Sequence, residues 1–343
     1  MLAILGTRRR TGSTSARIGP NDRATSMVPA LALITVLSWG TWIPVAQSVR
    51  GVEQRIRTFY VTIGNLVFAA AALLVAGGHI SIGWRGFWLP FAGGMLWTAG
   101  NFCAFRATEA IGLARAAGTW TPLNIIVAFV WGATVFGELS HFDAARYAVL
   151  VLALMMVFSG VALIVASQDV RRDDRPGSGP DAAGARPITE SLPQPGSARR
   201  SVGRRGLLWA IGAGLLWGTY FVPAQWAHVP AQVGNFPLAI GMFVAGLALA
   251  LPAGHAVKLS SGVTSVEMTA GALWGIGNLA LLGLVARIGT GAGFTIAQLS
   301  LLVNASIGIW IFKVPKPGTS AARTVLAGVV IAGIGGAVIG AIS

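Results

Sequence analysis

The sequence predicts an all-α polytopic membrane protein whose ten transmembrane helices form two inverted five-helix repeats. Three observations predict it. Hydrophobic residues make up 54% of the chain, long apolar stretches recur along it, and one apolar phrase occurs twice. Only 10% of the residues are charged, whereas a water-soluble domain carries about 25%. The chain therefore lacks the polar side chains needed to cover a folded domain in water.

Ten apolar segments account for most of the chain, five on each side of a polar stretch. They are expected at about 28–48, 57–77, 87–108, 114–136, 146–167, 206–227, 235–255, 268–286, 289–312 and 322–342. A helix needs about 20 apolar residues to cross the hydrocarbon core, and each segment is close to that length.

The residues outside the apolar segments include an N-terminal stretch and a central stretch that separates the first five segments from the last five. Residues 1–27 are rich in Arg and lack the apolar core of a signal peptide, so they are expected to be a disordered tail or a wrongly assigned start before Met27. Residues 168–205 are rich in Pro, Gly, Ser and Arg without hydrophobic periodicity, which predicts a basic disordered linker. The two expected repeats occupy 28–167 and 206–343.

Short sequence phrases of the first expected repeat recur in the second. The phrase LSWGTWIPVAQ at 37–47 returns as LLWGTYFVPAQ at 215–225, 178 positions later. LWTAGN at 96–101 returns as LWGIGN at 273–278, 177 positions later. An offset that holds across separate segments indicates an internal duplication. Because each unit has five spans, the second copy enters the membrane from the opposite side, an arrangement typical of transporters.

Positive charge predicts the orientation. The formal net charge is +14, and the Lys and Arg residues outside the N-terminal tail gather in the loops after every odd-numbered segment. Arg50, Arg55 and Arg57 are placed in the first of these loops. The positive-inside rule makes these loops cytoplasmic and puts both termini outside. The lipid bilayer therefore accounts for the charge better than a nucleic acid does.

Enzymatic and metal chemistry find little support in the sequence. The single cysteine, Cys103, excludes an internal disulfide and a cysteine-based metal cluster. The four histidines show no ligand spacing. No nucleophile–base pair or carboxylate cluster is recognisable. We therefore expect neither an enzyme, nor a metal, nor a cofactor.

Neutral amides at membrane depth are the first candidate site residues. Asn101 and Asn278 occupy matched positions of the two repeats, and Asn124 and Gln298 lie in segments 4 and 9. An unsatisfied amide in hydrocarbon costs several kcal/mol, so these side chains either pair between helices or face a wet cavity. Both alternatives stay open, and the matched pair favours the cavity.

Tryptophans are the second group. Trp39 matches Trp217, and Trp97 matches Trp274, all in mid-segment near a glycine that would let another group approach. Aromatic faces surrounded by amides and hydroxyls suit a neutral polyol such as a sugar, whereas a buried cation would require an intramembrane carboxylate. Helix packing is the alternative role.

The stretch GALWGIGNLALLGLVARIGTGAGFTIAQLSLLVNASIGIWIF at 271–312 resembles the bacterial glucose-uptake permeases. These belong to the glucose/ribose porter branch of the drug/metabolite transporter superfamily. GMLWTAGNFCAFRATEAIG at 94–112 is similar too, and the resemblance covers nearly all of 28–342. It implies ten helices, alternating access and a sugar as substrate. The matching positions are Trp97, Gly100, Trp274, Gly277, Asn278, Phe294 and Gln298, with similar amides at Asn101 and Asn124.

We expect a secondary transporter in the cytoplasmic membrane that moves a neutral monosaccharide such as glucose by alternating access, with or without proton coupling. The predicted substrate-binding residues are Trp39, Trp97, Asn101, Asn124, Trp217, Trp274, Asn278 and Gln298. Gln47 and Gln225 lie toward segment ends and are the predicted gate residues. The alternatives are an exporter of drugs, amino acids or cations from the same superfamily, and a membrane scaffold or sensor. The oligomeric state stays open.

Proton coupling would require a titratable group that faces the site. Glu109 is the candidate, although its spacing from Arg106 also fits an interfacial salt bridge. Glu267 lies at a segment end, where we expect it to anchor the structure.

Overall fold

The computed structural model describes residues 27–77, 82–137, 142–167, 195–229, 231–288 and 290–342, and most of these residues are helical, with no strand among them. The helices are α2 (Val28–Ser48), α3 (Gln54–Val75), α4 (Trp84–Ile111), α5 (Leu113–Thr134), α6 (Ala144–Ala166), α7 (Pro195–Trp217), α8 (Val222–Trp226), α9 (Ala231–Ala250), α10 (Ser261–Ile288), α11 (Thr290–Gln298), α12 (Ser300–Ser306) and α13 (Ser320–Ile342). A short 3₁₀ helix, η3 (Leu251–Val257), follows α9, and a π-helical turn, η4 (Ile307–Ile311), follows α12. The all-helical class predicted from the sequence is confirmed.

Every expected apolar segment coincides with helix in the structure. Among the described residues, seven helical stretches are long and apolar enough to cross a membrane. The helices α4 and α10 have 28 residues each, or about 42 Å at 1.5 Å per residue, which exceeds the bilayer core of about 30 Å. The expected N-terminal tail and most of the expected linker lie outside the described residues, and α7 begins at Pro195, within the linker range.

Two of the expected segments are broken helices. The second copy of the repeated phrase is interrupted, because α7 ends at Trp217 and α8 begins only at Val222. The first copy is continuous through α2, although Pro44 lies inside that helix. The ninth segment is likewise divided between α11 and α12, with Leu299 between them. Broken helices of this kind commonly line substrate sites in transporters.

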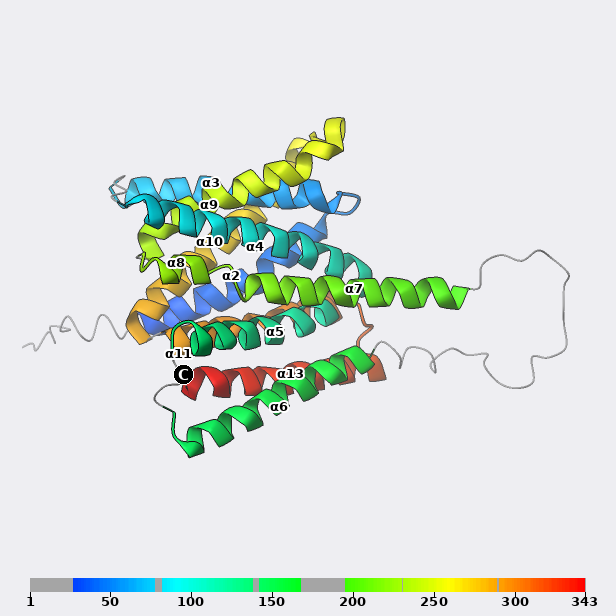
Figure 1. The fold of residues 1–343 in the computed structure, drawn as a ribbon. Helices are drawn as coiled ribbons and strands as arrows, with labels where there is room; N and C mark the ends of the chain where they lie inside the picture. The colour runs from blue at the N-terminus through cyan, green and yellow to red at the C-terminus, as the bar shows by residue number, and fades with distance from the viewer. Residues whose placement is uncertain are drawn as a thin grey trace, which may run out of the picture.

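The long helices run side by side in a bundle (Figure 1). α6 packs against α13 along one side of the bundle, and α3, α9, α4 and α10 pack against one another on the other side. α2 packs on α10, α7 packs on α4 and α5, and these helices occupy the middle. α8 and the C-terminus lie at one end of the bundle, and the start of α7 lies at the opposite end.

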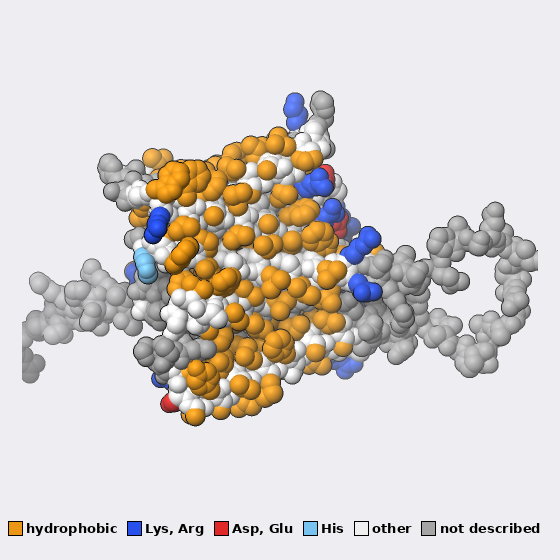
Figure 2. Space-filling view, in the orientation of Figure 1, with side chains coloured by type: hydrophobic (Ala, Val, Ile, Leu, Met, Phe, Trp, Pro, Cys, Tyr) orange, Lys and Arg blue, Asp and Glu red, His pale blue; other side chains and the backbone are white. Residues whose placement is uncertain are grey.

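The surface agrees with a bilayer as the surroundings. Figure 2 shows a broad apolar band across the helices and Lys and Arg side chains gathered mainly at the end where α7 begins. Leu74, Val75 and Leu208 are among the large apolar side chains left exposed. Because a band of exposed apolar side chains is stable in lipid rather than in water, the chain is a multi-pass membrane protein.

Glycines allow the helices to approach closely at matched places. The added Cβ of an alanine at Gly64 would overlap the backbone carbonyl of Met268, so α3 and α10 are in backbone contact. Gly241 meets the carbonyl of Phe91 in the same way, between α9 and α4. Gly64 and Gly241 are 177 positions apart, as are Phe91 and Met268. The α3–α10 contact is therefore repeated by the α9–α4 contact at the offset of the sequence repeat.

Candidate functional site

Tryptophans from both halves of the sequence meet in the buried core. The ring centroids of Trp97 and Trp274 lie 4.5 Å apart. Trp39 stacks on Trp274 at 6.5 Å with an interplanar angle of 9°. Trp217 stacks on Trp97 at 6.1 Å and 30°, which repeats the same arrangement with the halves exchanged. The structure thus brings together the four tryptophans that the sequence predicted as one site, and we call them the tryptophan cluster.

Two glycines, each three residues after a tryptophan of the cluster, are in close contact with another indole ring of the cluster. A Cβ added at Gly100 would lie 2.7 Å from Cδ1 of Trp217, and one at Gly277 would lie 2.5 Å from Cδ1 of Trp39. The gaps at Gly100 and Gly277 are therefore each filled by an indole of the other half. Nε1 of Trp217 also donates a hydrogen bond to the carbonyl of Trp97 at 3.1 Å.

Further aromatic side chains extend the cluster, and the sequence singled out only Phe294 among them, through the family resemblance. They are Trp42, Phe105, Trp120, Tyr220, Phe221 and Phe294. Trp42 contacts both Trp97 and Trp217, with centroids 5.7 and 5.9 Å away. Its position three residues after Trp39 puts the two on neighbouring parts of α2, a helical spacing that could have identified it.

The predicted amides have different surroundings. Nδ2 of Asn278 donates to Oδ1 of Asn235 at 2.9 Å, so this side chain pairs between α10 and α9. Asn101 is fully buried, yet neither its Nδ2 nor its Oδ1 has a hydrogen-bond partner among the described residues. Oδ1 of Asn124 and Nε2 of Gln298 are buried and lack partners in the same part of the chain. Buried amides without partners are costly, and a polar ligand would relieve that cost.

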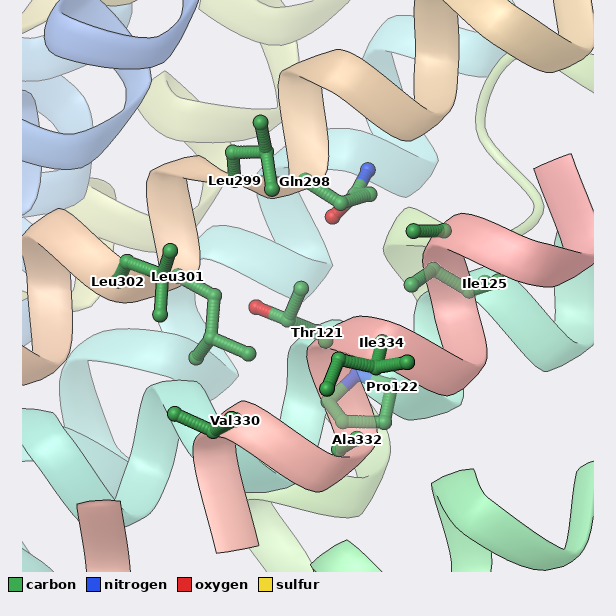
Figure 3. Close-up of a pocket in the computed structure, with 12 residues that line it drawn as sticks. Thr121, Pro122, Ile125, Gln298, Leu299, Leu301, Leu302, Val330, Ala332 and Ile334 are labelled. Atoms are coloured by element: carbon green, nitrogen blue, oxygen red, sulfur yellow. The ribbon is translucent and has the colours of Figure 1, made fainter. Parts of the chain in front are cut away.

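Gln298 borders a cavity of about 180 Å³ between α5, α11, α12 and α13. Figure 3 shows its side chain projecting into this space from the break between α11 and α12, with Thr121 on the facing helix. The rest of the lining is apolar and includes Ile125, Leu302 and Ile334. The helices around the cavity differ from those that carry the tryptophan cluster, which are α2, α4, α7 and α10.

The two predicted gate residues lie near opposite ends of the bundle. Gln47 is in the last turn of α2, and Gln225 is in α8. Nε2 of Gln47 is buried and has no hydrogen-bond partner in the described chain.

A buried ion pair joins α3 to α10. Nη1 of Arg57 lies 3.0 Å from Oε1 of Glu267, and the two side chains are 2% and 0% exposed. Nη2 of Arg57 also donates to the carbonyl of Val49 at 2.8 Å, and the guanidinium lies 5.7 Å from the ring centroid of Phe105. The sequence placed Arg57 in a loop. α3 instead begins at Gln54, which puts the arginine one turn inside the helix.

Glu109 occupies a different environment. Its Oε2 lies 3.6 Å from Nη1 of Arg106, three residues earlier on α4, and the two side chains are 54% and 38% exposed. This is the interfacial salt bridge that the spacing allowed. Among the described carboxylates, Glu53 and Glu109 also have ion-pair partners, but only Glu267 is buried.

These features define the class of the protein. It is a multi-pass membrane protein whose two sequence halves meet through matched aromatic pairs and buried amides. The chain belongs to the family described as sugar transport proteins, whose model matches residues 30–178 and 192–342. The match covers both sides of the central stretch. The resemblance to the bacterial glucose-uptake permeases is thereby confirmed.

Individual relatives agree with the family. A protein of Listeria monocytogenes that carries the provisional name of a sugar uptake protein is 25% identical over 315 residues, which cover 90% of this chain and 97% of the relative. The glucose uptake protein GlcU of Bacillus subtilis is 23% identical over 286 residues, with 83% and 88% covered. A protein of known crystal structure shares 17% identity and a TM-score of 0.58 over 92% of this chain and 97% of its own. That last likeness concerns the fold alone.

Proposed function

We propose that the protein is a permease that moves a neutral monosaccharide such as glucose across the cytoplasmic membrane by alternating access. The observation that carries the proposal is the matched stacking of Trp39 on Trp274 and of Trp217 on Trp97 in the buried core. Each stack joins the first half of the sequence to the second. A movement of one half against the other would therefore open or close both stacks.

Two inverted five-helix halves are supported by contacts between repeat mates. Nδ2 of Asn65 lies 3.2 Å from Sδ of Met242, exactly one repeat offset of 177 positions away. Trp97 and Trp274 are also separated by 177 positions, and their rings touch. Residues related by a twofold axis can touch each other only where they lie beside that axis. In this proposal the axis would pass between α3 and α9 and between α4 and α10.

The surroundings of the cluster suit a neutral polyol. When the stacks open, the indole faces would offer apolar surface to the C–H groups of a sugar ring, and Asn101 offers both a donor and an acceptor for hydroxyls. The buried carboxylate of Glu267 is balanced by Arg57, so this carboxylate leaves no net negative charge that would select a cation. The family and the names of the relatives point to the same substrate class.

The predicted site residues keep their proposed roles. Trp39, Trp97, Asn101, Asn124, Trp217, Trp274, Asn278 and Gln298 would contact the sugar during its passage. Gln47 and Gln225, near opposite ends, would close the path in turn. The arginine-rich end is cytoplasmic in this proposal, because positive charge accumulates there.

Uptake of labelled sugars into proteoliposomes tests the proposal, with and without a pH gradient. We expect saturable uptake of at least one neutral monosaccharide, reduced by an excess of the unlabelled sugar. A dependence on the gradient would establish proton coupling, and uptake without it would establish facilitated diffusion. Failure of every sugar, together with gradient-driven movement of a cation or an amino acid, would favour the exporter instead.

A further inference from the structure

Several buried polar atoms of the Arg57–Glu267 pair and of Asn101 have no hydrogen-bond partner in the described residues. They include Nε of Arg57, Oε2 of Glu267 and both amide atoms of Asn101. All three residues are at most 1% exposed. Taking an ion pair out of water costs several kcal/mol per ion, which the pair repays only when further hydrogen bonds satisfy its remaining groups. The contacts among the described residues do not supply those hydrogen bonds.

Asn101 and Arg57 lie along one aromatic wall, and Glu267 is joined to it through its ion pair with Arg57. Trp97, Asn101 and Phe105 follow each other at intervals of four residues on α4, which places them on one face of that helix. Trp42 contacts the rings on both sides of Asn101, with centroids 5.7 Å from Trp97 and 5.9 Å from Phe105. The guanidinium of Arg57 lies over Phe105. The aromatic wall of the tryptophan cluster therefore continues past Asn101 to the ion pair.

The repeat provides an internal comparison. Asn278, the repeat mate of Asn101 at the offset of 177, is hydrogen bonded to Asn235. The mate of Arg57, at the offset that relates Gly64 to Gly241, is Gly234, so the second half has no charged side chain at this position. The first half carries an amide and a cation here, with the carboxylate of Glu267 from α10. Asn101 keeps a free donor and a free acceptor in the described residues, whereas the Nδ2 donor of Asn278 is satisfied.

We propose that Arg57, Glu267 and Asn101 form a polar subsite that binds hydroxyl groups of the transported monosaccharide, beyond the tryptophan cluster toward the arginine-rich end. A hydroxyl can donate to the free oxygen of Glu267 and accept from the guanidinium or the Asn101 amide. Hydrogen bonds to ionised groups are about twice as strong as neutral ones, so this subsite would contribute strongly to sugar selectivity. The inference rests on the proposed function.

Titration of intrinsic tryptophan fluorescence in purified protein tests the subsite, with glucose and its monodeoxy analogues as probes. Wild-type protein should lose affinity by about tenfold for at least one analogue, the loss expected for one hydrogen bond to a charged group. In Glu267→Gln, the affinity for glucose should fall by a similar factor, and that analogue should lose little further. The matched control is the double variant Glu53→Gln/Arg55→Gln, which removes an exposed pair at the same end of the protein and should bind like wild type.

A single substitution leaves one buried charge without its partner and can prevent folding. The double variant Arg57→Gln/Glu267→Gln removes both charges and should fold, with a melting temperature near that of wild type in detergent. We expect it to bind glucose about tenfold more weakly or worse, and to discriminate little between glucose and the analogues. Undiminished affinity and discrimination in the folded double variant would overturn the subsite, as would equal affinity of wild type for all analogues. Absence of sugar binding and uptake in wild type would refute the proposed function itself.

Discussion

Trp97 and Trp274 are in contact at a centroid distance of 4.5 Å although 177 residues separate them, the same offset that relates the two copies of the W-x-x-G-N motif. Each ring is in turn stacked with a tryptophan of the opposite half, Trp217 on Trp97 and Trp39 on Trp274. The four rings therefore form a symmetric unit at the junction of the halves. A relative movement of the halves must rearrange it.

Replacing either central ring should affect sugar binding to a similar extent. Trp97→Phe and Trp274→Phe keep an aromatic ring but reduce its stacking surface, which should weaken binding by about 1 kcal/mol each. Fluorescence is altered by these substitutions, so equilibrium binding of labelled sugar is the measurement. Trp84→Phe, at a tryptophan that is 76% exposed, is the control. Wild-type affinity in both central variants would limit these rings to helix packing.

Alanine at the two matched glycines should destabilise the protein. The new methyl group at Gly100 or Gly277 would displace the indole of Trp217 or Trp39, and overpacking of this kind costs about 1–3 kcal/mol. Gly333→Ala is the matched control, because an added Cβ there has no atom within 4 Å and alanine favours a helix. Melting temperatures in detergent measure the difference. Stabilities for the Gly100 and Gly277 variants equal to that of the control would refute the close approach.

The sequence could predict the apolar segments and the matched tryptophan positions, because both can be recognised as patterns in the sequence itself. Apolar runs define the segments, and the repeated phrases identify Trp39 with Trp217 and Trp97 with Trp274. The partners of buried polar groups could not be predicted. Arg57 was placed in a loop because a charge at a segment edge usually faces solvent, whereas its partner Glu267 lies 210 positions away. Only the packing of α3 on α10 brings the two together.

The two amides with the clearest surroundings allow a direct comparison. Asn278→Ala removes the donor to Asn235, and Gln298→Ala removes the amide that projects into the cavity. If both contact the sugar, each substitution should weaken its binding by at least about 1 kcal/mol, the scale of a buried hydrogen bond. Leu302→Ala, on the apolar wall of the same cavity, separates loss of the amide from loss of packing. Unchanged affinity in both amide variants would assign them to helix packing.

The gate residues should be accessible from opposite sides of the membrane. Cys103 is buried and is the chain's single cysteine, so Cys103→Ala gives a background without thiols. In that background, Gln47→Cys should react with a membrane-impermeant thiol reagent from the cytoplasmic side, and Gln225→Cys from the outer side. Labelling of both from one side would contradict the inverted arrangement.

Substitution of Glu109 tests whether its carboxylate couples sugar uptake to protons. Because it is half exposed and paired with Arg106, we expect Glu109→Gln to change uptake rates by less than about twofold, in line with the small energies of surface ion pairs. The pH dependence of uptake should also be unchanged. Loss of the gradient dependence alone, with normal uptake in its absence, would instead establish Glu109 as the coupling residue.

Counterflow tests the central claim most directly. Proteoliposomes preloaded with unlabelled glucose are diluted into a trace of labelled glucose, and internal label is followed over time. Alternating access predicts that label rises transiently above the external concentration and then declines, since each return of the carrier is filled by internal sugar. Label that only equilibrates, or that enters no faster than into protein-free vesicles, would contradict a sugar permease that works by alternating its two halves.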